Sequence, residues 1–537
     1  MNNYDLSICF EYELINQDVV YISDLIDMDK YNNYQDELVD ILDTWYIKNG
    51  KDITSYKNIS LGKAFNFNFR TEYSEEINLV LMIFSFNNIN QNYKIFISKN
   101  YNININLFEI MKLLKIKYEI IRTTDIINDV LVKKIAIVKD SFLKSFIKEC
   151  IVLFNNIFKK KCKKRTFFQG YHSTKELIKY LDNNFVTDQL PYKEIIFSSN
   201  KSLYFNPNNS LGDKIESNIT ACFSEANFIM SDVMAILMNN HYLENKTKYT
   251  KFIDSIFTNF KKLNIQNAIL MTLKTGVSSV ISQYIHLING KVYLYVHGIR
   301  DFGKSVSRGD LVGAADGILC WSEFDYSKYK KLDRNLKLFK AGYPYFNTLQ
   351  PLKRVNSTKN KDMKILILPT GIFKLPGFDN QKSFNSILEL IRELLLKGYN
   401  KDNIIIKIHG GNLNLEFFKN YIGDFFPKEN IVQKENILHL MKKSDIIIGT
   451  ISTSIYESLF LGIPYILYDK HLDLFNENIL MSLNIPYFSS GNEVVNFLDD
   501  FKYPDIGSLK KEMLYSSNYE EILKILHQIN SIPNEKS

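Results

Sequence analysis

At 537 residues the chain is longer than a single hydrophobic core normally supports, so we expect two domains and allow for a third. Its hydrophobic share of 45% and charged share of 23% are those of an ordinary globular protein. The net charge of +7 is too mild for a dedicated nucleic-acid-binding protein, although it favours anionic ligands or surfaces. Five cysteines without metal-ligand spacing indicate reduced thiols in a cytoplasm.

The amino-terminal segment is acidic and lacks both the basic region and the long apolar stretch of a signal peptide. No segment reaches about 18 uninterrupted apolar residues, so we expect no transmembrane helix and a cytoplasmic location. Asp27 and Asp29 have the spacing of a metal-binding Asp-x-Asp pair, but no apolar strand precedes them to hold a metal. No other cluster has ligand spacing, and we therefore expect neither a metal nor a bound cofactor.

Residues 1–180 have the weakest pattern. Residues 94–98 predict a strand, which would add a first βα layer to the domain that follows. The segment 45–62 is dense in polar and aromatic residues, and it is either an acceptor pocket or an ordinary loop between helices.

The stretch 142–165 points to a membrane surface. Bulky apolar residues at helical spacing begin at Phe142 and run to Phe158, and six cations follow within the seven residues 159–165, which end at Arg165. This is typical of an interfacial anchor for anionic lipid. A core helix followed by a solvated basic loop is the alternative.

The middle of the chain predicts an α/β domain. Apolar runs at 267–273, 292–296 and 315–321 are strand-like, and a helix is expected to open near Thr275. Residues 342–344, Gly-Tyr-Pro, form a turn. Such alternation implies a parallel sheet with helices on both faces.

A charged and polar linker at 351–362 separates an amino-terminal domain, 1–350, from a carboxy-terminal domain, 363–537. The second domain begins with a strand at 363–368. Backbone near Gly371 is expected to approach a ligand, because ligands of open α/β sheets lie at the carboxyl ends of strands. A second strand, 404–409, ends in the basic residues Lys407 and His409.

The most informative stretch is 444–469, which predicts a strand, a loop, a short helix and a second strand. The first strand stops at Gly449, where the missing side chain allows a sharp turn. Hydroxyl side chains then stand where the helix should begin, a place that suits either a helix cap or a phosphate. They are Thr450, Ser452, Thr453 and Ser454. Glu457 follows Ser454 at capping-box spacing, and Gly462 and Pro464 end the helix.

This unit resembles the donor-nucleotide site of GT-B glycosyltransferases. The resemblance implies that Ser452, Thr453 and Ser454 contact the donor phosphates and that Glu457 binds the ribose. Lys407-Ile408-His409-Gly410 is similar to the Lys-x-His-Pro of bacterial capsule, sialic-acid and teichoic-type transferases, whose histidine contacts the donor phosphate, although glycine replaces the proline here. The implied fold class is α/β and GT-B-like, with two Rossmann-like doubly wound domains facing a central cleft. The resemblance also implies that the last helix crosses back to the first domain.

The middle domain is similar to the acceptor side of the same enzymes, where a strand ends in His-Gly. By that similarity His297 lies at the cleft and removes the proton from an acceptor hydroxyl, as an inverting transfer requires. Arg300 and Asp301 would bind phosphate or orient the imidazole. The family often has Gln or Trp before the His-Gly, whereas this chain has Val296.

The expected activity is therefore a metal-independent transfer of a sugar from a nucleotide sugar, CMP- or UDP-linked, to a surface-glycan or lipid-linked acceptor. The same fold also serves CDP-alcohol polyol-phosphate transferases and nucleotide-sugar 2-epimerases. A non-catalytic carbohydrate-binding member of the fold is the remaining alternative. The expected partners are the nucleotide sugar, the acceptor and, through residues 142–165, an anionic membrane, with no nucleic acid.

Overall fold

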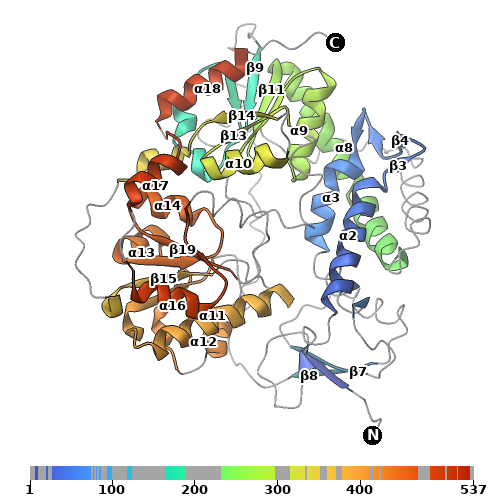
Figure 1. The fold of residues 1–537 in the computed structure, drawn as a ribbon. Coiled ribbons are helices and arrows are strands. Elements are labelled where there is room, and N and C mark those ends of the chain that lie inside the picture. Colours follow the sequence, from blue (N-terminus) through green and yellow to red (C-terminus); the bar gives the residue numbers. More distant parts are fainter. Residues whose placement is uncertain are drawn as a thin grey trace, which may run out of the picture.

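A computed structural model of the chain contains three parallel sheets, two of six strands and one of four (Figure 1). Two short antiparallel hairpins complete the described strands. The structure describes residues 6–9, 20–21, 27–73, 77, 80–81, 84–85, 93–98, 118–123, 164–188, 231–296, 315–332, 336–350, 360–369, 378–409, 415–422, 425–469, 484–501, 505–516 and 518–531.

The first sheet is built only from the amino-terminal part of the chain. Its order is β2-β1-β7-β8, and all neighbouring strands are parallel. The strands are β1 Leu6–Cys9, β2 Val20–Tyr21, β7 Tyr93–Ser98 and β8 Tyr118–Thr123. The strand predicted at 94–98 is therefore confirmed, but the added layer is wrong, because β7 pairs with β1 and β8 and not with the middle sheet.

Three helices lie beside the middle sheet. They are α2 Met28–Thr44, α3 Leu61–Glu72 and α8 Ser231–Lys262. Of these, α8 contacts strand β11, Ile265–Leu270, of that sheet, and α3 contacts both α8 and α2. Asp27 accepts a hydrogen bond from the Lys30 N–H at 3.1 Å, so it helps to start α2.

Between α2 and α3 lie two short hairpins, which occupy most of segment 45–62. Their strands are β3 Ile47–Lys48, β4 Lys51–Asp52, β5 Ser55–Tyr56 and β6 Ile59–Ser60. Trp45 is buried, and its ring centroid lies 4.9 Å from that of Tyr242 on α8. Its packing supports the interpretation of this segment as a loop between helices.

The middle sheet has the parallel order β10-β9-β11-β12-β13-β14. Its strands are β9 Arg165–Phe168, β10 Phe185–Thr187, β11 Ile265–Leu270, β12 Val292–Tyr295, β13 Gly317–Cys320 and β14 Lys337–Lys340. Helices α9 Gly276–Leu287 and α10 Glu323–Leu332 and the 3-10 turns η1 His172–Thr174 and η2 Leu177–Tyr180 accompany it. Thr275 caps α9 by accepting a hydrogen bond from the Ser278 N–H, as expected of a helix start there.

The carboxy-terminal sheet has the parallel order β17-β16-β15-β18-β19-β20. Its strands are β15 Ile365–Leu368, β16 Ile404–Lys407, β17 Ile431–Val432, β18 Ile446–Gly449, β19 Tyr465–Tyr468 and β20 Tyr487–Phe488. Its helices are α11 Phe378–Leu396, α12 Leu415–Ile422, α13 Ile437–Lys443, α14 Ser454–Leu461 and α16 Gly491–Asp499. The 3-10 turns are η4 Asn360–Asp362, η5 Lys401–Asn403 and η6 Lys428–Asn430.

Both six-stranded sheets are buried, as continuous apolar strands require. In chain order the carboxy-terminal strands lie as 3-2-1-4-5-6, the order of a Rossmann-like doubly wound domain. The predicted fold class, two Rossmann-like α/β domains with a GT-B-like arrangement, is confirmed.

The two six-stranded domains are joined by the 3-10 turn η3 Pro344–Thr348 and by two helices near the end of the chain, α17 Ile506–Met513 and α18 Tyr519–Ser531. Ile522, Leu526 and Ile529 of α18 lie in one apolar cluster with residues of β9 and β10. Thr166 of β9 also donates a hydrogen bond to Asn530 of α18. The expected return of the last helix to the first domain is thus confirmed.

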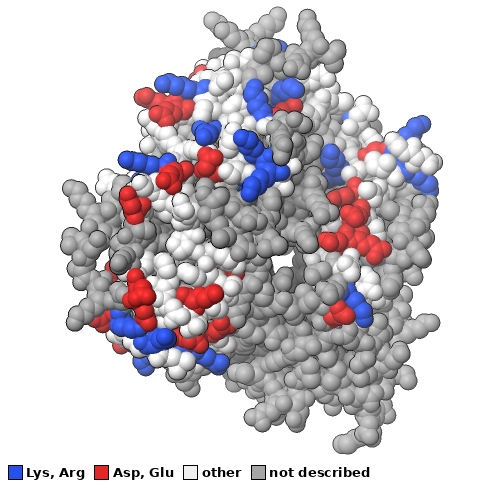
Figure 2. All heavy atoms as spheres, in the orientation of Figure 1, with Lys and Arg blue, Asp and Glu red and all other residues white. Residues whose placement is uncertain are grey.

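Figure 2 shows positive and negative side chains interspersed over the described part of one face of the molecule. Acidic side chains are concentrated along α2. Of the proposed lipid-binding stretch, residues 142–163 lie outside the described part of the chain. Arg165 is buried in β9 and donates hydrogen bonds to the carbonyls of Asn183 and Phe185, at 2.9 and 3.0 Å. Arg165 is therefore a structural cation, and its place in an exposed basic run was wrong. None of the described helices is both long enough and apolar enough to cross a membrane.

Candidate functional site

The loop 449–454 lies where strand order reverses in the carboxy-terminal sheet. Strand β15, first in the chain, has β16 on one side and β18 on the other, and Leu368 pairs with Gly449 at their ends. At such a point the connections that follow the two adjacent strands, here β15 and β18, run to opposite faces of the sheet. This opens a crevice at the carboxyl edge of the sheet. The loop that the sequence singled out is thus at the place where ligands of this fold class bind.

Close packing explains the glycine at the end of β18. A Cβ atom on Gly449 would lie 2.4 Å from the Tyr465 hydroxyl and 2.9 Å from the Leu368 carbonyl oxygen. The Tyr465 hydroxyl itself donates to the Thr450 carbonyl at 2.8 Å, which fixes the first residue of the loop. Gly449 therefore brings β18 and its loop close against the neighbouring strands.

The hydroxyl residues 452–454 shape the start of α14. The Ser454 N–H donates to Ser452 Oγ at 3.3 Å, and the Ile455 N–H donates to the Ser452 carbonyl at 3.1 Å. Thr453 is the N-cap residue, with helical backbone angles and no side-chain capping bond. The capping box expected from the spacing of Ser454 and Glu457 is therefore wrong, because the helix already includes Ser454 as its first residue. Gly462 ends the helix in the left-handed conformation, with φ of 76°, as expected.

Glu457 is consequently not a capping residue. Its side chain is mostly buried, and burial raises the pKa of its carboxyl to about 7. Its charge also raises the pKa values of Tyr343 and Tyr345 at the interdomain turn, after burial as the main cause. A carboxyl with a pKa raised by burial, beside a loop at a switch point, is typical of a functional site.

Lys407 and His409 lie at the same edge of the sheet, at the end of β16. The Lys407 ammonium donates to the Gln433 carbonyl at 2.8 Å, and burial lowers its pKa. The Gln433 side chain in turn donates to the His409 carbonyl at 3.3 Å, and the His409 side chain is exposed. Since β16 is the direct neighbour of β15, the edge that holds loop 449–454 also carries a cation and an accessible imidazole.

Four of the predicted site residues lie outside the described residues, namely Gly371, His297, Arg300 and Asp301. Strand β12 ends at Tyr295, so the predicted base follows the carboxyl end of a central strand of the middle sheet by two positions.

The sequence reasoning missed a group of buried side chains at the junction of the two domains. Ser322 and Asp325, at the start of α10, share a hydrogen-bond network with Tyr456 of α14. The available signal was the Ser-x-x-Asp spacing of residues 322 and 325, which marks a helix start. Nothing local in the sequence indicated the tyrosine from a different domain as the third member.

Among the described residues, no three histidine, cysteine, aspartate or glutamate side chains are grouped so that they would hold a metal ion. Cys320 is buried and forms no disulfide.

No family model matches the chain. No curated protein matches it either.

Among solved structures, similar chains include three enzymes. A UDP-GlcNAc 2-epimerase from Neisseria meningitidis, bound to UDP-GlcNAc, is 14% identical with a TM-score of 0.38, over 68% of this chain and 99% of that one. A wall teichoic acid polymerase, TagF, is 12% identical with a TM-score of 0.33, over 72% and 97%. MurG from Acinetobacter baumannii is 10% identical with a TM-score of 0.37, over 68% and 100%. At these identities and scores no activity is transferred to this chain, and the fold assignment rests on its own two parallel sheets.

Proposed function

We propose that the protein is a glycosyltransferase that moves a sugar from a nucleotide-activated donor to a surface-glycan or lipid-linked acceptor. One observation carries the proposal: the hydroxyl-rich loop 449–454 and the mostly buried Glu457 belong to one strand–loop–helix unit at the switch point of a Rossmann-like sheet. Donor phosphates would bind at residues 452–454, with Lys407 and His409 on the same sheet edge. Glu457 would accept hydrogen bonds from the ribose hydroxyls.

In the proposed reaction the acceptor hydroxyl oxygen attacks the anomeric carbon of the donor sugar. The bond from that carbon to the phosphate oxygen breaks, and the nucleotide leaves with the electron pair. His297 would take the acceptor proton, with Arg300 and Asp301 beside it. Charge on the departing phosphate would be stabilised by the loop and by the cation of Lys407, an effect that is stronger in a site from which water is excluded.

The donor site is tested by thermal unfolding with CMP, CDP, UDP, GDP and the matching nucleotide sugars. A ligand at about 100 times its Kd stabilises the folded state by about 2.7 kcal/mol, which gives a clear rise in Tm. We expect one nucleotide class to raise Tm. Because a hydrogen bond to a charged group contributes about 1.5–3 kcal/mol, Glu457→Gln should weaken its binding by about tenfold or more.

Glu429→Gln is the matched control, because Glu429 is exposed on η6 of the same domain and should bind as the wild type does. If no nucleotide shifts Tm, the donor-site proposal is overturned and a non-catalytic member of the fold is favoured. Once a donor is known, His297→Ala should remove transfer and leave nucleotide binding intact, and retained turnover would exclude His297 as the base.

A further inference from the structure

A buried hydrogen-bond network crosses from the middle domain to the carboxy-terminal domain next to Glu457. The Ser322 hydroxyl donates to Asp325 Oδ2 at 3.1 Å and accepts from the Asp325 N–H at 3.2 Å. The Tyr456 hydroxyl lies 2.5 Å from Ser322 Oγ. Either hydroxyl can donate in this bond, because the Asp325 carboxylate accepts hydrogen bonds from both Ser322 and Tyr456. The network therefore links α14 to α10 through two hydroxyls and one carboxylate.

The network is buried and flanked by aromatic rings, which makes its hydrogen bonds costly to break. Ser322 and Tyr456 are fully buried. The Trp321 ring stacks on Tyr343, with 3.8 Å between centroids, and meets Tyr456 edge-on at 6.3 Å. A polar atom left without a partner here costs about 1–3 kcal/mol. The edge-on contact of Trp321 with Tyr456 crosses between the two domains, and the buried hydrogen bond of Tyr456 with Ser322 adds a fixed register to it.

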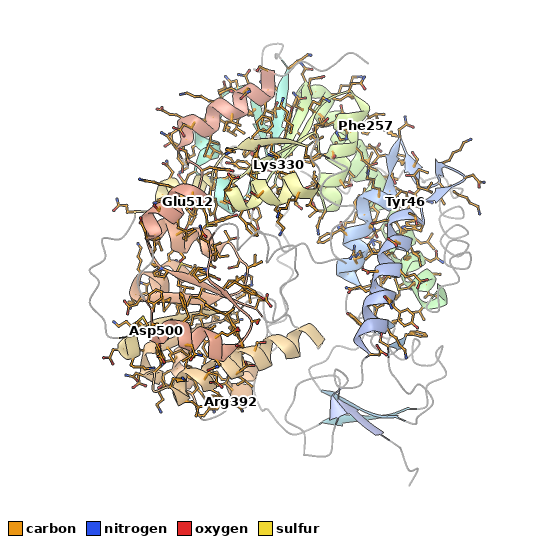
Figure 3. The ribbon with its side chains drawn as sticks, in the orientation of Figure 1. Tyr46, Phe257, Lys330, Arg392, Asp500 and Glu512 are labelled. Atoms are coloured by element: carbon orange, nitrogen blue, oxygen red, sulfur yellow. The ribbon has the colours of Figure 1, made fainter. Side chains whose placement is uncertain are left out.

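A second set of contacts supports the same junction. The Tyr515 hydroxyl, just after α17, donates to Glu323 of α10 at 2.5 Å, and the Tyr515 N–H donates to the Trp321 carbonyl at 3.3 Å. Ser322 and Leu514 form an isolated β-bridge. Figure 3 shows α10 and α17, which carry the labelled Lys330 and Glu512, where the two domains meet. Helix α14 also contacts α17, so it is held both by α17 and, through Tyr456, by the residue that precedes α10.

We infer that the Tyr456–Ser322–Asp325 network positions helix α14, so that Glu457 and loop 449–454 bind a nucleotide tightly only while this interdomain bond is intact. The inference rests on the proposed donor site and adds to it a positioning residue, Tyr456. Tyr456 directly precedes Glu457 in α14, so a displacement of Tyr456 also displaces Glu457. The middle domain would thus support a nucleotide site whose proposed contact residues all belong to the carboxy-terminal domain.

The test measures nucleotide Kd by titration calorimetry for wild type, Tyr456→Phe, Ser322→Ala and the double variant. Each single change removes the bond between Tyr456 and Ser322, and we expect each to weaken binding by about tenfold. The double variant should be no weaker than either single one, because both act through the same bond. Tyr242→Phe is the matched control, since it removes a buried tyrosine hydroxyl whose 3.2 Å bond to the Gly62 carbonyl lies in the helices beside the middle sheet.

The fluorescence of Trp321 supplies a second measurement, which a loss of stability alone would not change. The chain has two tryptophans, so a Trp45→Phe background leaves Trp321 as the sole fluorescent indole. Nucleotide binding should change its emission in that background, and Tyr456→Phe should abolish the change at saturating nucleotide and at a temperature where the protein is folded.

The outcomes separate this inference from the proposed function. If wild type binds no nucleotide, the donor site itself is refuted. If wild type binds and the Tyr456 and Ser322 variants bind equally well, the donor site stands and the positioning role is refuted. Additive losses in the double variant, or an equal loss in Tyr242→Phe, would also refute it, because both would show a general effect on stability.

Discussion

Glu457 is the residue whose chemistry is most open to test. Its pKa of about 7 means that its ionisation changes in the physiological range. In the proposed site only the ionised carboxylate would accept both ribose hydrogen bonds, so we expect nucleotide affinity to increase as pH rises through about 7. Titration calorimetry between pH 5.5 and 8.5 measures this. The nucleotide phosphate also titrates, so the decisive quantity is the difference from Glu457→Gln, and identical profiles in both proteins would contradict the prediction.

The raised pKa of Glu457 also leads us to expect that the stability of the protein depends on pH. Its folded pKa lies above the unfolded value of 4.5, so both states are protonated at low pH. As pH rises from about 4.5 to about 7 the unfolded state ionises first, and the free energy of unfolding therefore falls. The full difference is at most about 3 kcal/mol. Urea unfolding at pH 5 and pH 8 should show Glu457→Gln gaining stability relative to wild type at the higher pH, and an equal difference at both would contradict this.

At the scale of one element, the turn from β18 into α14 depends on the absence of a side chain at residue 449. Gly449→Ala would push a methyl group against the Tyr465 hydroxyl and the Leu368 carbonyl. We expect destabilisation of about 1–3 kcal/mol. Adding Tyr465→Phe removes the hydroxyl oxygen but not the carbonyl contact, so it should recover part of this loss. Denaturant unfolding of both single variants and the double variant measures the coupling, and strict additivity would contradict it.

One interpretation at this scale was corrected by a helix boundary that spacing does not reveal. Ser454 and Glu457 have capping-box spacing, but α14 begins one residue before such a box would allow. A capping box does form at Ser490 and Glu493 of α16, with the same spacing. The residue pattern was equal in the two places, and the conformation of the preceding loop decided which one formed a cap.

At the scale of the whole molecule, α18 connects the end of the chain to the middle domain. Leu526 is fully buried in the cluster that this helix shares with β9 and β10. Leu526→Ala should lower the free energy of unfolding by about 2–5 kcal/mol, since it leaves a cavity. Leu396→Ala is the control, because that side chain is 80% exposed and its loss should change stability little. Urea denaturation compares the two, and an equal effect would mean that α18 does not stabilise the fold.

The sequence by itself determined the glycine turn after β18, the hydroxyl residues at the carboxyl edge of the last sheet and most of the inner strands of the two six-stranded sheets, namely β11, β12, β13, β15, β16, β18 and β19. These features depend on short apolar runs, turn residues and spacing, all local in the chain. Only the tertiary structure decided that β7 pairs within a separate sheet and that Tyr456 meets Ser322, 134 positions away. The physical reason is that sheet pairing and interdomain contact depend on which surfaces are buried together, and residues far apart in sequence carry no local mark of a shared interface.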